Sequence, residues 1–202
     1  MNYSTFRHLF LMIVLASGIP FAAGCTTRVI PVSASEITIP DESHGVLFGK
    51  MHLTRNGQDL STGLQWPMEM KWWVTEETHG RSFLIAHLPT NGSFAVKLPV
   101  GSYRVTDINF PGVRGLWHTV LPTSFTIRSR ECTSLGTSEF EMHTGFLTGS
   151  ITRTVSNEQG LLQDDFESLL KTQNCPTAVA PLESPAKSLV RLWFHTRDSG
   201  RH

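Results

Sequence analysis

The chain has 202 residues, of which 40% are hydrophobic and 17% are charged, with 17 basic and 17 acidic groups. This length accommodates one domain or slightly more, and the apolar content after residue 45 suffices for a hydrophobic core, which excludes a disordered chain. A formal charge of zero gives no overall attraction to nucleic acid, so no nucleic-acid partner is expected.

The N-terminus begins with an apolar segment. Arg7 precedes an almost unbroken apolar run from Leu9 to Ala23. A helix that spans a bilayer needs about 20 apolar residues, whereas this run is shorter and contains Gly18 and Pro20. Residues 1–24 are therefore predicted to be a signal peptide that is cleaved during export.

The stretch Phe21-Ala22-Ala23-Gly24-Cys25 resembles the lipobox of bacterial lipoproteins, in which small residues precede a cysteine that is acylated and becomes the mature N-terminus. Ala22 departs from the pattern, because the family usually has Leu there. The resemblance implies a diacylglycerol and an acyl chain on Cys25, and several chains on one residue make a durable anchor. The alternatives are ordinary secretion without lipidation and an N-terminal apolar segment that has no targeting role.

Thr26 follows this cysteine, at the position where an aspartate would imply retention in the inner membrane. The resemblance therefore implies an outer-membrane lipoprotein that faces the periplasm, with the membrane as its first partner.

Two further cysteines, Cys132 and Cys175, lie in the part of the chain that follows. In an oxidising envelope they are predicted to form one disulfide, and two separately buried thiols are the alternative. Neither has a partner in a CxxC motif, so no zinc or redox site is predicted.

Residues 25–44 contain prolines 31 and 40, scattered Ser and Thr, and only short apolar pieces. This composition predicts a semi-extended tether, in which Ile37 to Ile39 could add an edge strand. A β-sandwich domain is expected over residues 45–198.

Strands are predicted wherever apolar residues alternate between turn signals, at 45–53, 68–75, 81–88, 94–98, 103–110, 117–121, 124–127, 139–143, 145–155 and 188–196. Asn56-Gly57 is a predicted turn. The strand at 81–88 has apolar residues in both phases, which predicts burial of both its faces.

Residues 91–110 are predicted to form a β-hairpin with one buried face and a turn at 99–102. Tyr103 is expected in the core with its hydroxyl bonded to a backbone group. The buried phase changes after Val105, which predicts a bulge or a change of sheet near Thr106.

One amphipathic helix is predicted at about 157–173, with Leu162, Phe166, Leu169 and Leu170 on one face. This helix is expected to pack on the sheet. Prolines 176, 181 and 185 predict a loop before the final strand.

Two motifs, Asn91-Gly92-Ser93-Phe94 and Leu98-Pro99-Val100-Gly101-Ser102-Tyr103, resemble those of carboxypeptidase regulatory-like and transthyretin-like (prealbumin-like) domains. The resemblance covers about 45–127. The strand pattern predicts an all-β protein, and the resemblance implies a transthyretin-like antiparallel β-sandwich with one C-terminal helix and a final strand. Most members of this family are accessory, folding or binding modules.

No nucleophile elbow, H-E-x-x-H motif or glycine-rich phosphate loop occurs, so no catalytic residue is assigned and an enzyme is not expected. The histidines are dispersed, and His52, His87 and His195 are the set that strand geometry would bring together. Surface or core histidines are the simpler interpretation, so no metal site and no cofactor besides the lipid are expected.

Five tryptophans occur, and most are expected in the core. Trp66 in a loop and Trp73 on the strand face opposite Trp72 are the candidates for an exposed binding surface. The sequence therefore favours a non-enzymatic interaction or structural module of the envelope with an unidentified protein partner. The alternative is a glycan- or peptidoglycan-binding module that uses Trp66 and Trp73, and an envelope hydrolase is a third hypothesis.

Overall fold

The structure is a computed structural model, and it describes residues 26–32, 41–60, 69–112, 115–121, 123–156, 166, 177–180 and 186–193. The elements of this part are all strands: β1 (Thr27–Val29), β2 (His44–Arg55), β3 (Gln58–Asp59), β4 (Glu69–Glu76), β5 (Ser82–Pro89), β6 (Asn91–Pro99), β7 (Gly101–Gly112), β8 (Gly115–Thr119), β9 (Ser124–Ile127), β10 (Cys132–Thr144), β11 (Thr148–Ser156), β12 (Thr177–Val179) and β13 (Ala186–Trp193). The predicted all-β class is confirmed. None of the described residues belongs to a helix that is long and apolar enough to cross a membrane.

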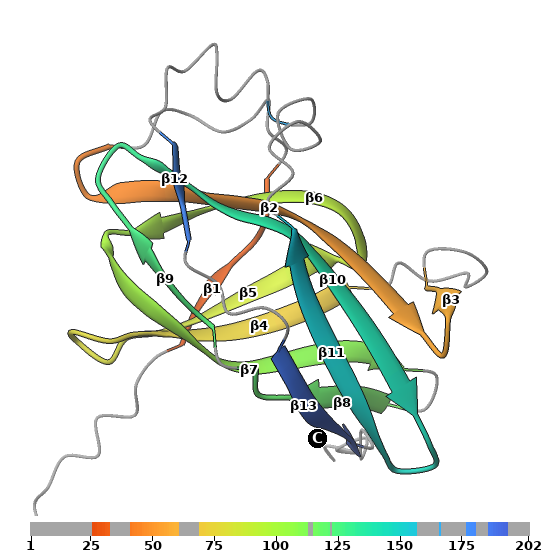
Figure 1. Cartoon of the computed structure of the whole chain (residues 1–202). Helices are drawn as coiled ribbons and strands as arrows, with labels where there is room; N and C mark the ends of the chain where they lie inside the picture. The colour runs from red at the N-terminus through yellow and green to blue at the C-terminus, as the bar shows by residue number, and fades with distance from the viewer. Residues whose placement is uncertain are drawn as a thin grey trace, which may run out of the picture.

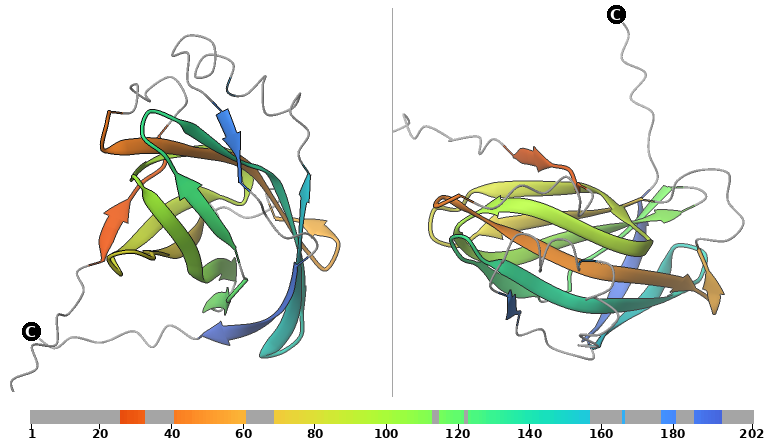
Figure 2. Two further views of the ribbon diagram at one scale, coloured as in Figure 1. Left: turned by 60° about the vertical axis from the view of Figure 1, so that its left-hand side comes forward. Right: turned by 90° about the horizontal axis from the view of Figure 1, so that it is seen from above.

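The strands form one curled sheet in the order β1-β5-β4-β7-β8-β13-β11-β10-β2-β3, with β6 on β2, β9 on β7 and β12 on β10. β2, β6 and β10 lie above β4, β5 and β7 in Figure 1, and β11 and β13 join these two layers along one side. Figure 2 shows the same curl from two further directions. On the other side the layers meet through Val32, which forms an isolated bridge to Ala95 of β6 just after β1.

The sheet is mixed, so the predicted antiparallel arrangement is wrong. β1 pairs with β5, β2 with β10 and β10 with β12 in parallel, while the other pairs are antiparallel. Parallel partners need a long crossover between them, and many residues separate each of these pairs in the chain. The strand pattern of a sequence carries no information on this direction, and the transthyretin-like fold is not supported by the pairing.

β6 and β7 are present, but they do not pair with each other, so the predicted hairpin is wrong. β6 pairs with β2, whereas β7 pairs with β4, β8 and β9. The chain therefore crosses between the layers at Pro99 and Gly101, and the N–H of Val100 donates to Ser43 O over 3.0 Å. Both strands have a fully buried face, and placing them in opposite layers buries both faces in one core.

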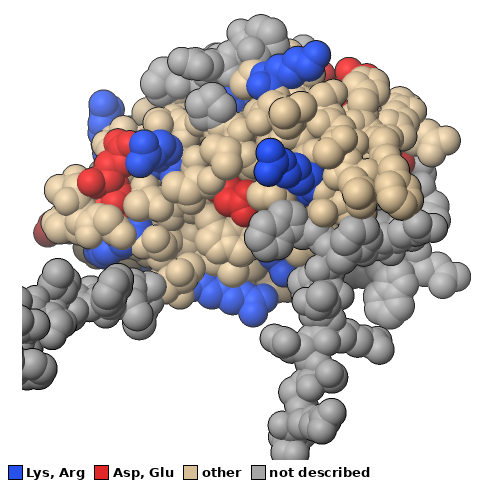
Figure 3. All heavy atoms as spheres, turned by 90° about the horizontal axis from the view of Figure 1, so that it is seen from below, with Lys and Arg blue, Asp and Glu red and all other residues tan. Residues whose placement is uncertain are grey.

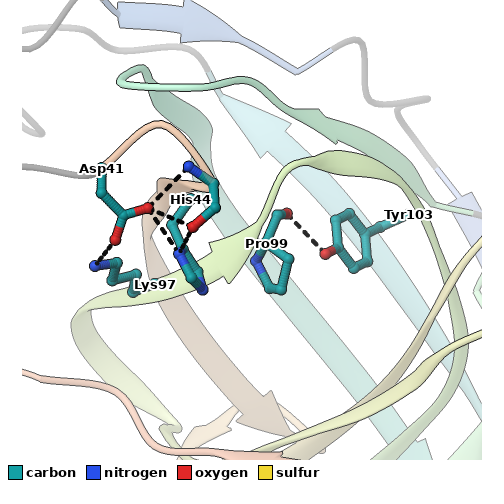
Figure 4. A network of polar contacts seen from close by, with 6 residues as sticks. Asp41, His44, Lys97, Pro99 and Tyr103 are labelled. Atoms are coloured by element: carbon teal, nitrogen blue, oxygen red, sulfur yellow. Dashed lines mark hydrogen bonds and ion pairs between the residues drawn. The ribbon is translucent and has the colours of Figure 1, made fainter.

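Tyr103 is fully buried directly after this crossing. Its hydroxyl donates to Pro99 O over 2.8 Å, which Figure 4 shows, and the predicted backbone partner is confirmed. Its ring stacks on Phe125 with centroids 5.4 Å apart and meets Phe83 edge-on at 5.8 Å.

Aromatic side chains fill the space between the layers. Trp72 of β4 meets Phe94 of β6 and Phe140 of β10, each with centroids 6.5 Å apart. Phe110 of β7 meets Phe140 at 5.5 Å. All of these rings are almost completely buried, so the expectation that Trp72 lies in the core is confirmed.

The bulge that was predicted near Thr106 is confirmed. Trp73 pairs with Asp107 and Val74 with Val105, which leaves Thr106 without an opposite residue. Its hydroxyl donates to Trp73 O over 3.1 Å. Because of this extra residue, the buried positions are odd-numbered up to Val105 and even-numbered from Ile108 onward.

The C-terminal part differs from expectation at β12. Thr177–Val179 pairs with β10, although the flanking prolines predicted a loop. The predicted helix at 157–173 lies outside the described residues except for Phe166. That side chain is buried against Phe48 of β2, with ring centroids 4.9 Å apart.

Part of the predicted tether contacts the domain. Thr27–Val29 forms β1 on β5, and Val32 reaches β6. Residues 33–40 and the predicted signal peptide at 1–24 lie outside the described part of the chain.

Candidate binding face

The outward side of β4 carries Trp73. Burial alternates along this strand: Met70, Trp72 and Val74 are buried, while Lys71 and Trp73 are partly exposed. The predicted division of the strand into two faces is therefore confirmed. Trp73 is neither fully covered nor fully exposed.

Neighbouring strands continue this surface on both sides of Trp73. In the register, Trp73 pairs with Leu84 of β5 and with Asp107 of β7, and Leu84 pairs with Arg28 of β1. Directly opposite residues have Cβ atoms about 5 Å apart on the same side of a sheet. The Trp73 face is defined here by these residues and their outward neighbours: Arg28, Glu69, Lys71, Trp73, Leu84, His87 and Asp107.

His87 reaches this face because β5 contains a bulge. Met70 pairs with Leu88 and Trp72 with Ile85, so two residues of β5 lie opposite Lys71 alone. His87 has a φ of 60°, which is uncommon outside glycine, although histidine adopts it more often than most residues. The bulge turns the imidazole outward. The prediction that both faces of this strand are buried is therefore wrong, because its two apolar phases arise from the bulge.

The imidazole of His87 joins two charged groups. Its Nδ1 contacts Glu69 Oε2, and its Nε2 contacts Nη2 of Arg28. Since a guanidinium only donates, Nε2 accepts, and a proton on Nδ1 then serves the carboxylate. A neutral imidazole satisfies both contacts and connects β1 to β4 and β5 through side chains.

A second polar pair lies on the other side of Trp73. His118 Nδ1 of β8 is 3.3 Å from Asp107 Oδ1. The partly exposed indole is thus surrounded by groups of both signs. Figure 3, which views the molecule from the side of β4, β7 and β8, shows blue basic groups dispersed over a largely uncharged surface.

Chemically, the Trp73 face can stack an apolar ligand surface on the indole while the surrounding groups donate and accept hydrogen bonds. Sequence reasoning found Trp73, named His87 only within a set of histidines weighed as a metal site, and missed Arg28. Arg28 lies in the segment interpreted as a tether. The pattern that could have revealed His87 is the presence of apolar residues in both alternating phases of β5. This pattern is as consistent with a bulge as with burial of both faces.

A separate cluster around Asp41 contains Ser, His and Asp, and Figure 4 shows it. Asp41 Oδ1 accepts from the Ser43 hydroxyl over 2.6 Å and from His44 Nδ1 over 2.9 Å. Lys97 Nζ binds the other carboxylate oxygen over 3.0 Å. The Ser43 hydroxyl, then His44 and Lys97, hold the pKa of Asp41 well below its usual value.

This cluster is not arranged as a proton relay. A relay needs Ser and Asp on opposite nitrogens of the imidazole. Here the Ser43 hydroxyl is 2.8 Å from Nδ1 of His44, the same nitrogen that contacts Asp41. The Ser43 N–H also donates to Asp41 Oδ1 over 2.9 Å, so the carboxylate closes the turn that leads into β2.

Several residues that the sequence singled out lie outside the described part of the chain: Cys25, Trp66, Cys175 and His195. Cys132 is fully buried at the start of β10. In the β10–β12 register it pairs with Thr177, which follows Cys175 by two positions.

The histidines proposed as a set have different neighbours. His52 Nε2 is 3.6 Å from Asp59 Oδ2, while His87 lies between Glu69 and Arg28. Within the described residues, no group of three or more His, Cys, Asp or Glu side chains could hold a metal ion.

No family model matches the chain, and no curated protein matches it. Among solved structures, a leucine-rich repeat protein from Bacteroides thetaiotaomicron aligns with 55% of this chain at 15% identity and a TM-score of 0.32. The chain spans only 15% of that protein's length. A likeness this remote carries no argument on fold or function.

Proposed function

We propose that this protein is an outer-membrane lipoprotein, held by acyl chains on Cys25, whose all-β domain is a non-enzymatic interaction module of the cell envelope. The observation that carries this proposal is the apolar run of residues 9–23, which ends in Gly24-Cys25. The all-β domain begins with Thr27, so the anchor and the domain adjoin. Periplasmic exposure and an unidentified protein partner belong to the same proposal.

The test is metabolic labelling with a clickable palmitate analogue in a diderm bacterium that expresses the full chain. Wild type incorporates the label and fractionates with the outer membrane, whereas Cys25→Ala remains an unlabelled precursor or becomes soluble. Thr26→Ala is the matched control and keeps the label. Label on the Cys25→Ala chain would refute the lipobox assignment.

A glycan- or peptidoglycan-binding module remains the alternative, and the partial exposure of Trp73 among polar groups favours it. Cosedimentation of the full chain with purified peptidoglycan sacculi tests it. Trp73→Ala is expected to reduce the bound fraction several-fold, whereas Val179→Ala at an exposed position on β12, outside this face, leaves it unchanged. Equal binding of both variants and wild type would exclude Trp73 as the platform.

The predicted disulfide between Cys132 and Cys175 is part of the same proposal. The register places Thr177 opposite Cys132, and two extended residues span about 7 Å, so Cys175 can reach it.

The Asn91 to Tyr103 motifs keep a local likeness to carboxypeptidase regulatory-like domains, which supports an accessory or binding role by analogy alone.

A further inference from the structure

The turn between β10 and β11 exposes large apolar side chains. Gly145 N–H donates to Thr148 O over 2.9 Å, which closes a turn with Phe146 and Leu147 at its centre. Phe146 is 80% exposed and Leu147 is 44% exposed. Turn centres usually carry Gly, Asn, Asp or Pro, and neither apolar residue is required for this turn.

The neighbouring strand β13 extends this surface. Leu192 N–H donates to Leu147 O over 3.0 Å, and Arg191 pairs with Thr148. Leu189 lies two residues from Arg191 on the same outward side and is 71% exposed. The apolar tip is defined here as Phe146, Leu147 and Leu189, with Arg191 beside it.

A row of basic and polar groups connects the tip to the Trp73 face. Across the register, Lys71 of β4 pairs with Asn109 of β7, which pairs with His118 of β8, which pairs with Arg191 of β13. These residues share the outward side of the sheet. The Asp107 carboxylate adjoins the row through its contact with His118, so the two cations, Lys71 and Arg191, provide the attraction to anionic lipid headgroups.

The proposed lipid anchor lies close to the other end of this surface. Cys25 precedes Thr27 of β1 by two positions, and two extended residues span about 7 Å. The beginning of β1 and the β10–β11 turn both lie on the lower side of the molecule in Figure 1. A lipid on Cys25 therefore holds this side of the domain near the membrane.

We infer that the apolar tip inserts into the interface of the membrane that carries the Cys25 lipid, and that the row from Lys71 to Arg191 lies against its headgroups. Aromatic and aliphatic side chains insert shallowly in this way when basic residues flank them. The inference rests on the proposed anchor. It adds a second attachment point, which fixes the orientation of the domain on the membrane.

The test uses the full, acylated protein in phosphatidylethanolamine–phosphatidylglycerol vesicles. Leu147→Cys carries an environment-sensitive fluorophore. Val179→Cys is the matched control, because Val179 is 45% exposed and its strand β12 lies on the upper side of the molecule in Figure 1. Unsubstituted protein gives the labelling background. Lipids with a spin label high on the acyl chain should quench the Leu147 reporter several-fold more than the Val179 reporter.

Adding Phe146→Glu to the Leu147→Cys chain should abolish this quenching while mass spectrometry still finds the acyl groups. A Leu147 reporter that stays in water on an acylated chain would overturn the insertion and leave the anchor intact. Protection of the reporter without lipid quenching, rising with protein density, would assign the tip to a second copy of the chain. Absence of acyl groups from wild type would overturn the anchor itself.

Discussion

Tyr103 combines two interactions at the point where the chain crosses from one layer to the other. Its ring packs between Phe83 and Phe125, and its hydroxyl binds the carbonyl of Pro99. Proline has no N–H and therefore cannot donate to a hairpin ladder there. The hydroxyl therefore stabilises this crossing, which no strand pairing between β6 and β7 supports.

Tyr103→Ala is expected to cost about 3–5 kcal/mol of stability, as for other aromatic truncations in a core. Tyr103→Phe keeps the ring contacts and loses only the hydrogen bond, at about 1 kcal/mol. Urea unfolding of the full chain measures both. A midpoint for Tyr103→Ala within error of wild type would show that this ring is peripheral to the core.

Burial also raises the pKa of Tyr103 to about 12, from 10.0. The folded state therefore favours the neutral phenol, and its stabilising contribution is complete below pH 10 and is lost between pH 10 and 12. Tyr103→Phe should remove this part of the alkaline loss of stability. Unfolding midpoints that fall equally in both proteins from pH 10 to 12 would contradict the assignment.

Glu76 is the second residue whose titration affects stability. Its buried carboxylate accepts from Thr78 N–H over 2.8 Å and from His79 N–H over 3.0 Å, in the turn between β4 and β5. Burial raises its pKa, but the hydrogen bonds from the His79 side chain and these N–H groups outweigh it and lower the pKa to about 2, from 4.5.

Since the folded pKa of Glu76 is depressed, its stabilising contribution is complete above pH 4.5 and is lost as the pH falls towards 2. Glu76→Gln should flatten this part of the acid unfolding profile and lower the midpoint at pH 7. Glu77→Gln on the neighbouring residue is the control and should follow wild type. Parallel profiles for wild type and Glu76→Gln between pH 4.5 and 2 would exclude this role.

At the scale of elements, β2 depends on glycine where another segment crosses it. A Cβ on Gly45 would lie 2.4 Å from Arg128 O and 3.0 Å from Glu131 O. The turn before β10 contacts β2 here, since Val46 N–H donates to Glu131 O over 3.0 Å. The clash is with backbone, which cannot rotate away as a side chain can.

Gly45→Ala is therefore expected to cost about 3 kcal/mol or more, at the upper end of overpacking effects. Gly57→Ala provides the comparison, because nothing lies within 4 Å of its Cβ position and only its φ of +77° opposes the substitution. That strain costs about 1 kcal/mol. Thermal melts should rank the two variants in this order, and the reverse order would contradict the close approach.

At the scale of the whole molecule, the last described strands join the two layers of the curled sheet. β12 pairs with β10, and β13 pairs with β8 and β11. The last described residues therefore stabilise strands from both layers. A bond from Cys132 to Cys175 would secure β12 to this arrangement.

Non-reducing peptide mapping of the exported protein should recover Cys132 and Cys175 in one linked fragment. Cys175→Ser, or reduction, is expected to cost about 4 kcal/mol in a loop of this size by the chain-entropy model. Equal unfolding midpoints with and without reductant would favour two separate thiols. Lipidation at Cys25 should be unaffected in either case.

The sequence by itself determined most of the strands and one of their local irregularities. Alternation placed Trp72 inward and Trp73 outward, and the change of phase after Val105 located the bulge at Thr106. These features are local, because side-chain direction follows from the two-residue period of a strand.

Only the tertiary structure decided which strands pair and in which direction. Asn91 to Val105 predicted two strands and a turn correctly, yet each strand pairs with a partner distant in the chain. The Trp73 face was equally beyond prediction, since it joins Arg28 and Trp73 through β5. Pairing depends on how several apolar faces share one core, and alternation within a strand is the same whichever partner it meets.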